Sequence, residues 1–116
     1  MVQSLKFKNP PRLFNDFVKN SGITNEQIAV IRKVSSFLQS VINTNNLLLS
    51  QIKIGKATDE EVVIYRTSEK GIYDIVIDTD GDVMVSFSGY VEKGGRLFYD
   101  KDEFEPSIHI QDFFLK

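Results

Sequence analysis

The segment IDTDGDV, residues 77–83, places three aspartates at alternate positions around one glycine. Clustered carboxylates can ligate a divalent cation, and Asp-rich loops with a central glycine are typical of calcium sites. An EF-hand loop that begins at Asp78 needs glycine at its sixth position and glutamate at its twelfth. These positions hold Val83 and Gly89. The sequence therefore predicts no metal site, and a weak cation between Asp78 and Asp82 is the alternative.

The same segment fits a β-hairpin with a three-residue turn at 79–81. A type I turn closed by a left-handed glycine favours aspartate at its first position, where Asp78 stands. This turn pairs Ile77 with Val83, so the apolar positions of both strands fall on one face. A two-residue turn would mix apolar and polar positions. The predicted register also pairs Ile75 with Val85 and Tyr73 with Phe87.

The other residue types with catalytic potential form no recognisable set. His109 is the only histidine and cysteine is absent, which excludes a histidine pair for a metal and a thiolate nucleophile. The run IHIQ places His109 at an outward position of a predicted strand. The glycines of EKGG, residues 92–95, lack the ending of a phosphate-binding loop. We expect no catalytic residue, no metal and no cofactor; a hydrolase-like enzyme that uses clustered carboxylates is the alternative.

The N-terminal half carries the signals of two helices. A first helix is expected from a cap at Asn9, through two prolines that a first turn tolerates, to a left-handed stop at Gly22. Thr24 and Gln27 match a capping box, which predicts that a longer helix begins at about Asn25. Its apolar positions recur at intervals of three and four: Ile28, Ile31, Val34, Leu38, Val41 and Ile42.

After the acidic link TDEE, residues 58–61, the apolar period changes to two, which is typical of β-strands. The runs VVIYRT, IYDIVID and VMVSFSGY predict an antiparallel meander, and RLFY and IHIQDFF predict one or two further strands. The four-residue connection SEKG predicts a hairpin in which Ile64 pairs with Ile75. The segment LLLSQIKIG, residues 47–55, is ambiguous between a helical turn and a strand. The central strands share a predicted core face of Val62, Ile64, Tyr73, Ile75, Ile77, Val83, Val85 and Phe87.

The opposite face of this meander is more apolar than a solvent-facing sheet surface usually is. The predicted registers place Val63, Val76 and Met84 in one row, with Tyr65 in the adjacent row. Either the C-terminal tail IHIQDFFLK covers this row, or a partner does. The row is therefore a candidate interaction surface, and a homodimer through it is one alternative.

The net charge of −2 is unevenly distributed. Residues 1–58 carry eight Lys or Arg against two acids, a net charge of +6, and residues 59–116 carry six against fourteen, a net charge of −8. Acidic loops on a rigid sheet suit a basic protein partner, because opposite potentials accelerate encounter. The alternative is that the two halves neutralise each other within one fold. The candidate acids of one loop are Asp100, Asp102, Glu103 and Glu105.

The sequence predicts one α+β domain over residues 1–116, with two N-terminal helices, one of them long, packed on one face of an antiparallel β-meander of four to six strands. The helical part covers about 9–46 and the meander about 47–116. No apolar run has the length of a membrane span and no signal peptide is recognisable, so we expect a cytoplasmic protein without membrane association.

The favoured function is a non-catalytic protein-interaction module, such as an adaptor, inhibitor or immunity-type protein, with a protein partner of basic character. Its candidate interaction residues are Val63, Tyr65, Val76, Met84, Asp100, Asp102, Glu103 and Glu105. Nucleic-acid binding through the basic helical half is the alternative, which the sequence pI of about 5.4 disfavours. The basic residues are Lys6, Lys8, Arg12, Lys19, Arg32, Lys33, Lys53 and Lys56.

Overall fold

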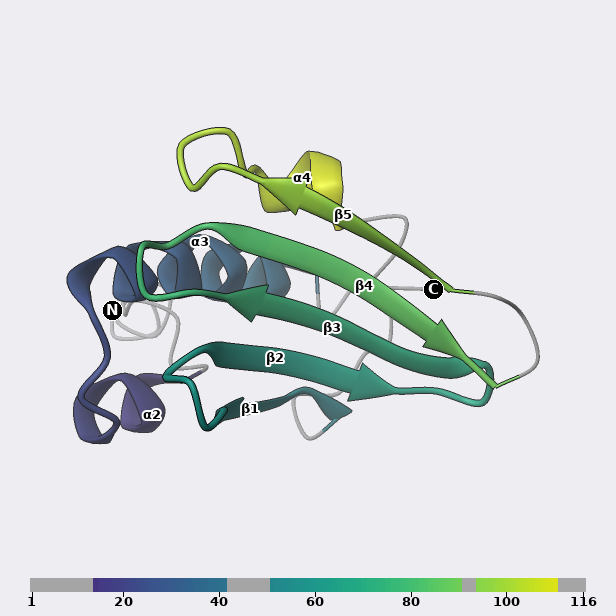
Figure 1. Cartoon of the computed structure of the whole chain (residues 1–116), viewed down its shortest axis with the longest axis horizontal. Coiled ribbons are helices and arrows are strands. Elements are labelled where there is room, and N and C mark those ends of the chain that lie inside the picture. Colours follow the sequence, from purple (N-terminus) through teal and green to yellow (C-terminus); the bar gives the residue numbers. More distant parts are fainter. Residues whose placement is uncertain (1–13, 42–50, 91–93, 111–116) are drawn as a thin grey trace, which may run out of the picture.

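The computed structural model describes residues 14–41, 51–90 and 94–110, and in these ranges it contains three helices and one five-stranded antiparallel sheet (Figure 1). The strands lie in the sheet in chain order. The α+β class, the antiparallel meander and one long helix are thus confirmed, and the ambiguous segment LLLSQIKIG contributes to a strand. The elements are α2 (Asn15–Asn20), α3 (Asn25–Val41), β1 (Lys53–Lys56), β2 (Val62–Thr67), β3 (Gly71–Ile77), β4 (Val83–Gly89), β5 (Gly95–Tyr99) and α4 (Pro106–His109).

Helix α3 and the sheet contribute to one cluster of buried side chains. Figure 1 shows α3 behind the strands. Each fully buried aliphatic side chain contributes about 1.5–3 kcal/mol to folding, so this cluster is the main source of stability. Helix α2 has no buried residue of its own, and the predicted layer of two helices stays a prediction. The cluster includes Val30, Ile31, Val34 and Leu38 from α3 and Val62, Ile64, Tyr73, Ile75, Ile77, Val83 and Val85 from the sheet.

The backbone conformation of Phe14 defines the start of helix α2. Phe14 has a left-handed backbone with φ 74°, which cannot continue a right-handed helix. The prediction of one helix from Asn9 through this position is therefore wrong: the first described helix begins at Asn15, and residues 1–13 lie outside the described ranges. Gly22 has the expected left-handed backbone, with φ 66°.

Gln27 connects the start of α3 to two other parts of the fold. The N–H of Thr24 donates to its Oε1 at 3.0 Å, and the N–H of Gln27 donates to the Thr24 hydroxyl oxygen at 3.1 Å, which confirms the capping box. The Nε2 of Gln27 donates to the carbonyls of Glu60, at 3.0 Å, and Ile77, at 3.1 Å. The Thr24 hydroxyl also donates to the Thr79 carbonyl at 2.8 Å. Gln27 is only 1% exposed, so its hydrogen bonds join helix, strand and loop inside the core.

The β3–β4 hairpin has the predicted three-residue turn. The N–H of Asp78 donates to the Asp82 carbonyl at 3.0 Å, and the N–H of Gly81 donates to the Asp78 carbonyl at 2.9 Å. Gly81 has φ 91°, as the closing glycine of this turn requires. The registers predicted for both hairpins are confirmed, and they pair Ile77 with Val83, Ile75 with Val85, Tyr73 with Phe87 and Ile64 with Ile75.

The segment after β5 is helical at 106–109, so the strand predicted there is wrong. Pro106 lacks the N–H that a strand ladder needs, but this loss costs nothing at the start of a helix. His109 is therefore not at an outward strand position. Its ring stacks on Tyr99 with 4.0 Å between centroids, and its Nδ1 accepts a hydrogen bond from the N–H of Glu105 at 2.9 Å. Residues 111–116 of the predicted strand lie outside the described ranges.

We predict that Gln27→Met lowers the free energy of unfolding by at least about 2 kcal/mol, because it keeps the side-chain volume but leaves two carbonyls and one N–H without their partner. Urea unfolding followed by circular dichroism measures this change. The matched control is Gln39→Met, at an exposed position of the same helix. An equal effect at both sites would contradict the role of the buried amide.

Gly81→Val is expected to cost about 1–2 kcal/mol, because β-branched residues resist a positive φ. A Cβ at this position would also lie 3.1 Å from the Cβ of Glu26 and 3.2 Å from the Cδ of Lys101. Gly95→Val is the control, since a Cβ there meets nothing within 4 Å. Thermal unfolding should separate the two variants; similar melting temperatures would show that the turn tolerates valine.

Candidate functional site

The candidate site lies on the sheet face opposite the core. We call this the outer face. In Figure 1, α3 and α4 lie behind the sheet, and no described helix crosses in front of the strands. The registers assign to the outer face the residues that alternate with the core positions: Lys53, Gly55, Val63, Tyr65, Thr67, Ile72, Asp74, Val76, Met84, Ser86, Ser88, Arg96 and Phe98.

An apolar row crosses the middle of the outer face. Val63 pairs with Val76, and Val76 pairs with Met84, as predicted. Strand β5 extends the row, because Met84 pairs with Phe98. The first three side chains are half-buried, whereas Phe98 is 73% exposed. In the adjacent row, Tyr65 is 36% exposed. The outer face therefore presents contiguous apolar surface across four strands.

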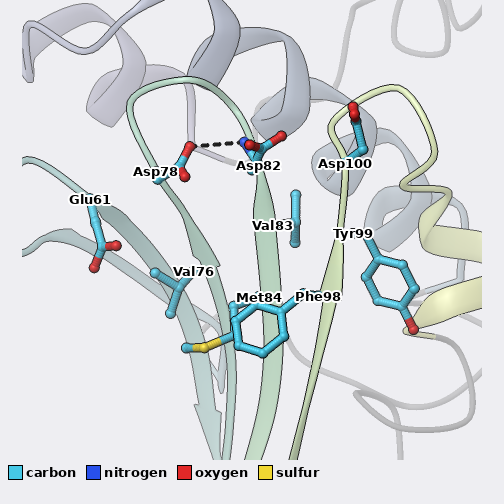
Figure 2. A pocket seen from close by; sticks show the side chains of 9 residues that line it. All are labelled: Glu61, Val76, Asp78, Asp82, Val83, Met84, Phe98, Tyr99 and Asp100. Atoms are coloured by element: carbon cyan, nitrogen blue, oxygen red, sulfur yellow. Dashed lines mark hydrogen bonds between the residues drawn. The ribbon is translucent and has the colours of Figure 1, made fainter.

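A pocket of about 490 Å³ lies between three residues of this row and the β3–β4 turn, and we call it the acid-rimmed pocket (Figure 2). Its apolar floor is formed by Val76, Met84 and Phe98. Figure 2 shows carboxylates beside and above these three side chains. The pocket thus combines apolar contact surface with concentrated negative charge. Its lining residues are Glu61, Val76, Asp78, Asp82, Val83, Met84, Phe98, Tyr99 and Asp100.

Backbone N–H groups hold three of the carboxylates in place. The Oδ1 of Asp78 accepts hydrogen bonds from two N–H groups of the β3–β4 turn, at 3.0 and 2.9 Å. The Oδ1 of Asp82 accepts one from the N–H of Lys101 at 3.3 Å, and the Oδ1 of Asp100 accepts one from the N–H of Asp102 at 2.9 Å. Each hydrogen bond uses Oδ1. The aspartates are therefore oriented in advance, and Oδ2 can accept from a ligand.

The fourth carboxylate, Glu61, is harder to ionise than an ordinary glutamate. Burial raises the pKa of Glu61, and the negative charges of Asp59 and Asp78, with a hydrogen bond to Asp59, raise it further. A cation in the pocket would oppose these effects, because it stabilises the ionised form. Cation binding should therefore release a proton from Glu61 at a pH near its raised pKa.

Asp74 lies near the centre of the outer face, beside Tyr65. Burial raises the pKa of Asp74, and the Ser86 hydroxyl, which donates to its Oδ2 at 3.5 Å, partly offsets this rise. Burial therefore disfavours the ionised form of the Asp74 side chain in the folded chain. His109 stacks on Tyr99, which lines the acid-rimmed pocket although its register position, opposite Val83, lies on the core face.

The predicted interaction residues divide into separate groups. Three of them line the acid-rimmed pocket: Val76, Met84 and Asp100. Two others lie further along the outer face: Val63 and Tyr65.

The other three predicted acids lie away from the pocket. Asp102 lines a different hollow, beside Lys33 of α3. Glu103 and Glu105 are exposed in the segment between β5 and α4. Proximity in sequence to Asp100 therefore did not bring these acids into its site.

Sequence reasoning missed Glu61, Phe98 and Tyr99 as contributors to the pocket, and it assigned Val83 to the core alone. A signal for Phe98 was present, since the run RLFY puts it on the same strand face as Arg96, but the sequence alone leaves the register of β5 against β4 open. Glu61 carried no such signal. It precedes β2, and its approach to Asp78 depends on the pairing of β2 with β3.

Two basic residues of the helical half are used inside the fold. The Nζ of Lys33 donates to the carbonyls of Lys101, at 3.0 Å, and Phe104, at 3.1 Å. The Nζ of Lys56 donates to the Ser21 carbonyl at 2.8 Å and forms an ion pair with Glu60 at 3.0 Å. Residues Lys6, Lys8 and Arg12 lie outside the described ranges. Lys33 and Lys56 are therefore engaged in contacts within the described part of the chain.

In the described ranges, no group of three acidic or histidine side chains is arranged to hold a metal ion. Likewise, none of the helices in residues 14–41, 51–90 and 94–110 has the length and apolar character to cross a membrane. Comparisons of the chain with protein-family models, with curated proteins and with solved structures gave no match. The site itself is therefore the basis for inferring function.

We predict that Asp74→Asn raises the melting temperature at pH 7. The raised pKa means that the folded state binds the Asp74 proton more tightly than the unfolded state does. The free energy of unfolding therefore falls as pH rises from the ordinary pKa through the raised pKa. Asparagine removes the charge and keeps an acceptor for Ser86. The gain over wild type should shrink as pH falls from the raised pKa toward the ordinary aspartate value of 3.8, and it should be absent below that value. Asp80→Asn, at the exposed turn, controls for the change in net charge; an equal gain there would contradict the prediction.

Proposed function

We propose that this domain is a non-catalytic protein-interaction module that binds a basic segment of another protein on its outer face. The observation that carries the proposal is the acid-rimmed pocket, with four carboxylates around an apolar floor. A lysine or arginine side chain is complementary to it, because the methylene stem covers apolar surface while the charged head reaches the rim. We propose further that the helices occupy only the core face, which leaves the outer face open to the partner.

The electrostatic part of the proposal rests on orientation as well as charge. Hydrogen bonds to charged groups are shorter and about twice as strong as neutral ones. The turn N–H groups hold Asp78, Asp82 and Asp100 before a ligand arrives, so little side-chain entropy is lost on binding. Glu61 adds affinity where it is ionised. Binding should therefore strengthen as pH rises through the raised pKa of Glu61.

The apolar row adds a second requirement for the partner. From β2 to β5 the row crosses three interstrand spacings, about 14 Å in total. About four or five residues of extended peptide cover this distance. The segment we propose therefore carries a basic residue for the pocket and apolar or aromatic residues for the surface around Val63 and Tyr65. An adaptor, inhibitor or immunity-type role fits such a surface.

Other functions fit this surface less well. Nucleic-acid phosphates would be repelled by the carboxylates of the rim. A homodimer through the outer face would bring the four rim carboxylates of each copy into one interface, against Lys53 and Arg96 as the cations of that face. For a hydrolase, Asp74 and Glu61 offer carboxyl groups that hold a proton more tightly than usual, but the described residues show no assembled nucleophile and base.

The test uses a fluorescein-labelled decapeptide of alternating Lys and Leu, with an alternating Glu and Leu peptide as the acidic counterpart. We expect the basic peptide alone to bind, and binding should weaken progressively as salt rises from about 50 to about 500 mM. The triple variant Asp78→Asn, Asp82→Asn, Asp100→Asn should bind about tenfold more weakly at low salt. Each lost charge pair is worth about 0.5 kcal/mol, and asparagine retains the Oδ1 acceptor that holds each turn.

The matched control removes three charges outside the pocket, with Asp102→Asn, Glu103→Gln and Glu105→Gln. It should change the dissociation constant less than threefold, about 0.6 kcal/mol. Fluorescence anisotropy gives both constants. Equal losses of affinity in the two triple variants would show that peptide binding depends only on net charge. Binding that is insensitive to salt would overturn the proposal.

A further inference from the structure

The two edges of the sheet differ in how they are protected against pairing. Strand β1 has four residues with lysine at both ends, and short, lysine-bearing edge strands resist association. Strand β5, with the sequence GRLFY, has neither lysine nor proline. Its Leu97 is 59% exposed and its Phe98 is 73% exposed. In Figure 1, β5 is the outermost strand on its side, and no described strand pairs with its outer edge.

The hairpins show which backbone groups of β5 point outward. The N–H of Asp78 donates to the carbonyl of Asp82, so these two facing residues are a hydrogen-bonded pair of the β3–β4 ladder. Hydrogen-bonded and non-hydrogen-bonded pairs alternate along an antiparallel ladder. Even-numbered residues of β4 therefore bond to β3, and odd-numbered residues bond to β5. The hydrogen bond from the N–H of Ser68 to the Gly71 carbonyl, at 2.8 Å, gives the same alternation.

The register of β4 and β5 completes this assignment. Val85 pairs with Leu97, and both are odd-numbered, so the N–H and C=O of Leu97 are directed at β4. The N–H and C=O groups of Arg96 and Phe98 are therefore directed away from the sheet. The open edge offers two donors and two acceptors in the spacing of a strand ladder.

We propose that β5 pairs with β5 of a second copy of this chain, antiparallel and centred on Leu97. The N–H and C=O of Arg96 then bond to Phe98 of the second copy, and the reverse pair forms by symmetry. The two five-stranded sheets become one continuous sheet with a two-fold axis, which is the commonest symmetry of homodimers. The backbone groups that form this dimer belong to the edge of the sheet and not to the acid-rimmed pocket, although Phe98 and Asp100 contribute side chains to both.

The side chains of β5 make a second copy a better occupant than an unrelated strand. On the outer face, this register sets Arg96 directly opposite Phe98 of the second copy, and a guanidinium over an aromatic ring is a favourable pair. The same Arg96 lies diagonally across from Asp100 of the second copy, an opposite charge. On the other face, Leu97 meets Leu97. Strand β5 and the adjacent Asp100 thus supply both halves of every contact.

The exposed apolar residues near this edge support the same conclusion. Outside β5, Ile108 of α4 is 71% exposed, and α4 lies behind β5 in Figure 1. Three of the five large exposed apolar side chains in the described residues, Leu97, Phe98 and Ile108, therefore belong to β5 and α4. Pairing of two five-residue strands buries a small area, so we expect a weak, concentration-dependent dimer.

Amide hydrogen exchange measured by NMR tests the pairing residue by residue on the wild-type chain. As the concentration rises from about 10 to about 500 µM, the amides of Arg96 and Phe98 should become at least several-fold better protected. The amide of Leu97 should be protected at both concentrations, because it bonds to β4. Sedimentation velocity should show the monomer converting to dimer over the same range. A chain that stays monomeric, or protection that does not alternate along β5, would overturn the proposal.

The variant Arg96→Pro removes an outward N–H without removing a bond to β4, and proline is tolerated at edge positions of this kind. It should sediment as a monomer at every concentration. Arg96→Ala, which keeps the N–H, should still dimerise, with an association constant reduced less than tenfold.

If Arg96→Pro is unstable, Leu97→Lys places like charges opposite each other and should also abolish the dimer, whereas Leu97→Thr should not. Dimerisation of Arg96→Pro or Leu97→Lys at wild-type affinity would contradict the pairing. Raising salt should change this dimer little, unlike peptide binding in the pocket.

Discussion

The buried amide of Gln27 is the interaction on which the arrangement of helix, sheet and loop depends. Its Oε1 accepts from the N–H of Thr24, and its Nε2 donates to the carbonyls of Glu60 and Ile77. An amide inside an apolar core is tolerated only when its donors and acceptor are satisfied. This requirement holds the first turn of α3 against the end of β3 and against the segment before β2. The same two segments carry Glu61 and Asp78, so the position of the acidic rim follows from the core.

The β3–β4 turn connects this framework to the site. Asp78 closes the turn with its backbone and accepts two turn N–H groups with its side chain. A residue that forms a turn in this way also has a fixed carboxylate, so one aspartate contributes to both stability and surface charge. Lys101 donates its N–H to Asp82 and its carbonyl accepts from Lys33, which links the segment after β5 to α3. The pocket is therefore built on rigid parts of the fold, which suits recognition without rearrangement.

The outer face and the β5 edge have different physical characters, and together they describe a domain with two contact surfaces. The outer face is acidic at one end and apolar along its middle, so its contacts should depend on salt. The β5 edge offers backbone hydrogen bonds and apolar side chains, which depend on salt much less. In the proposed dimer, Arg96 of the second copy lies next to Asp100, at the margin of the acid-rimmed pocket. Association of two copies would therefore alter the charge at that margin.

The sequence by itself determined the elements whose causes are local. The capping box at Thr24 and Gln27, the glycine turn at 79–81 and the period-two alternation identified α3, the β3–β4 hairpin and its register, because neighbouring residues decide caps, turns and strand faces. Only the tertiary structure decided the rest. The alternation of apolar and polar residues in IHIQ predicted a strand, whereas Pro106 begins a short helix there and His109 stacks on Tyr99. The pocket joins residues that lie up to 39 positions apart in the chain, from Glu61, just before β2, to Asp100, just after β5. Such convergence depends on strand order and sheet twist, which no local pattern specifies.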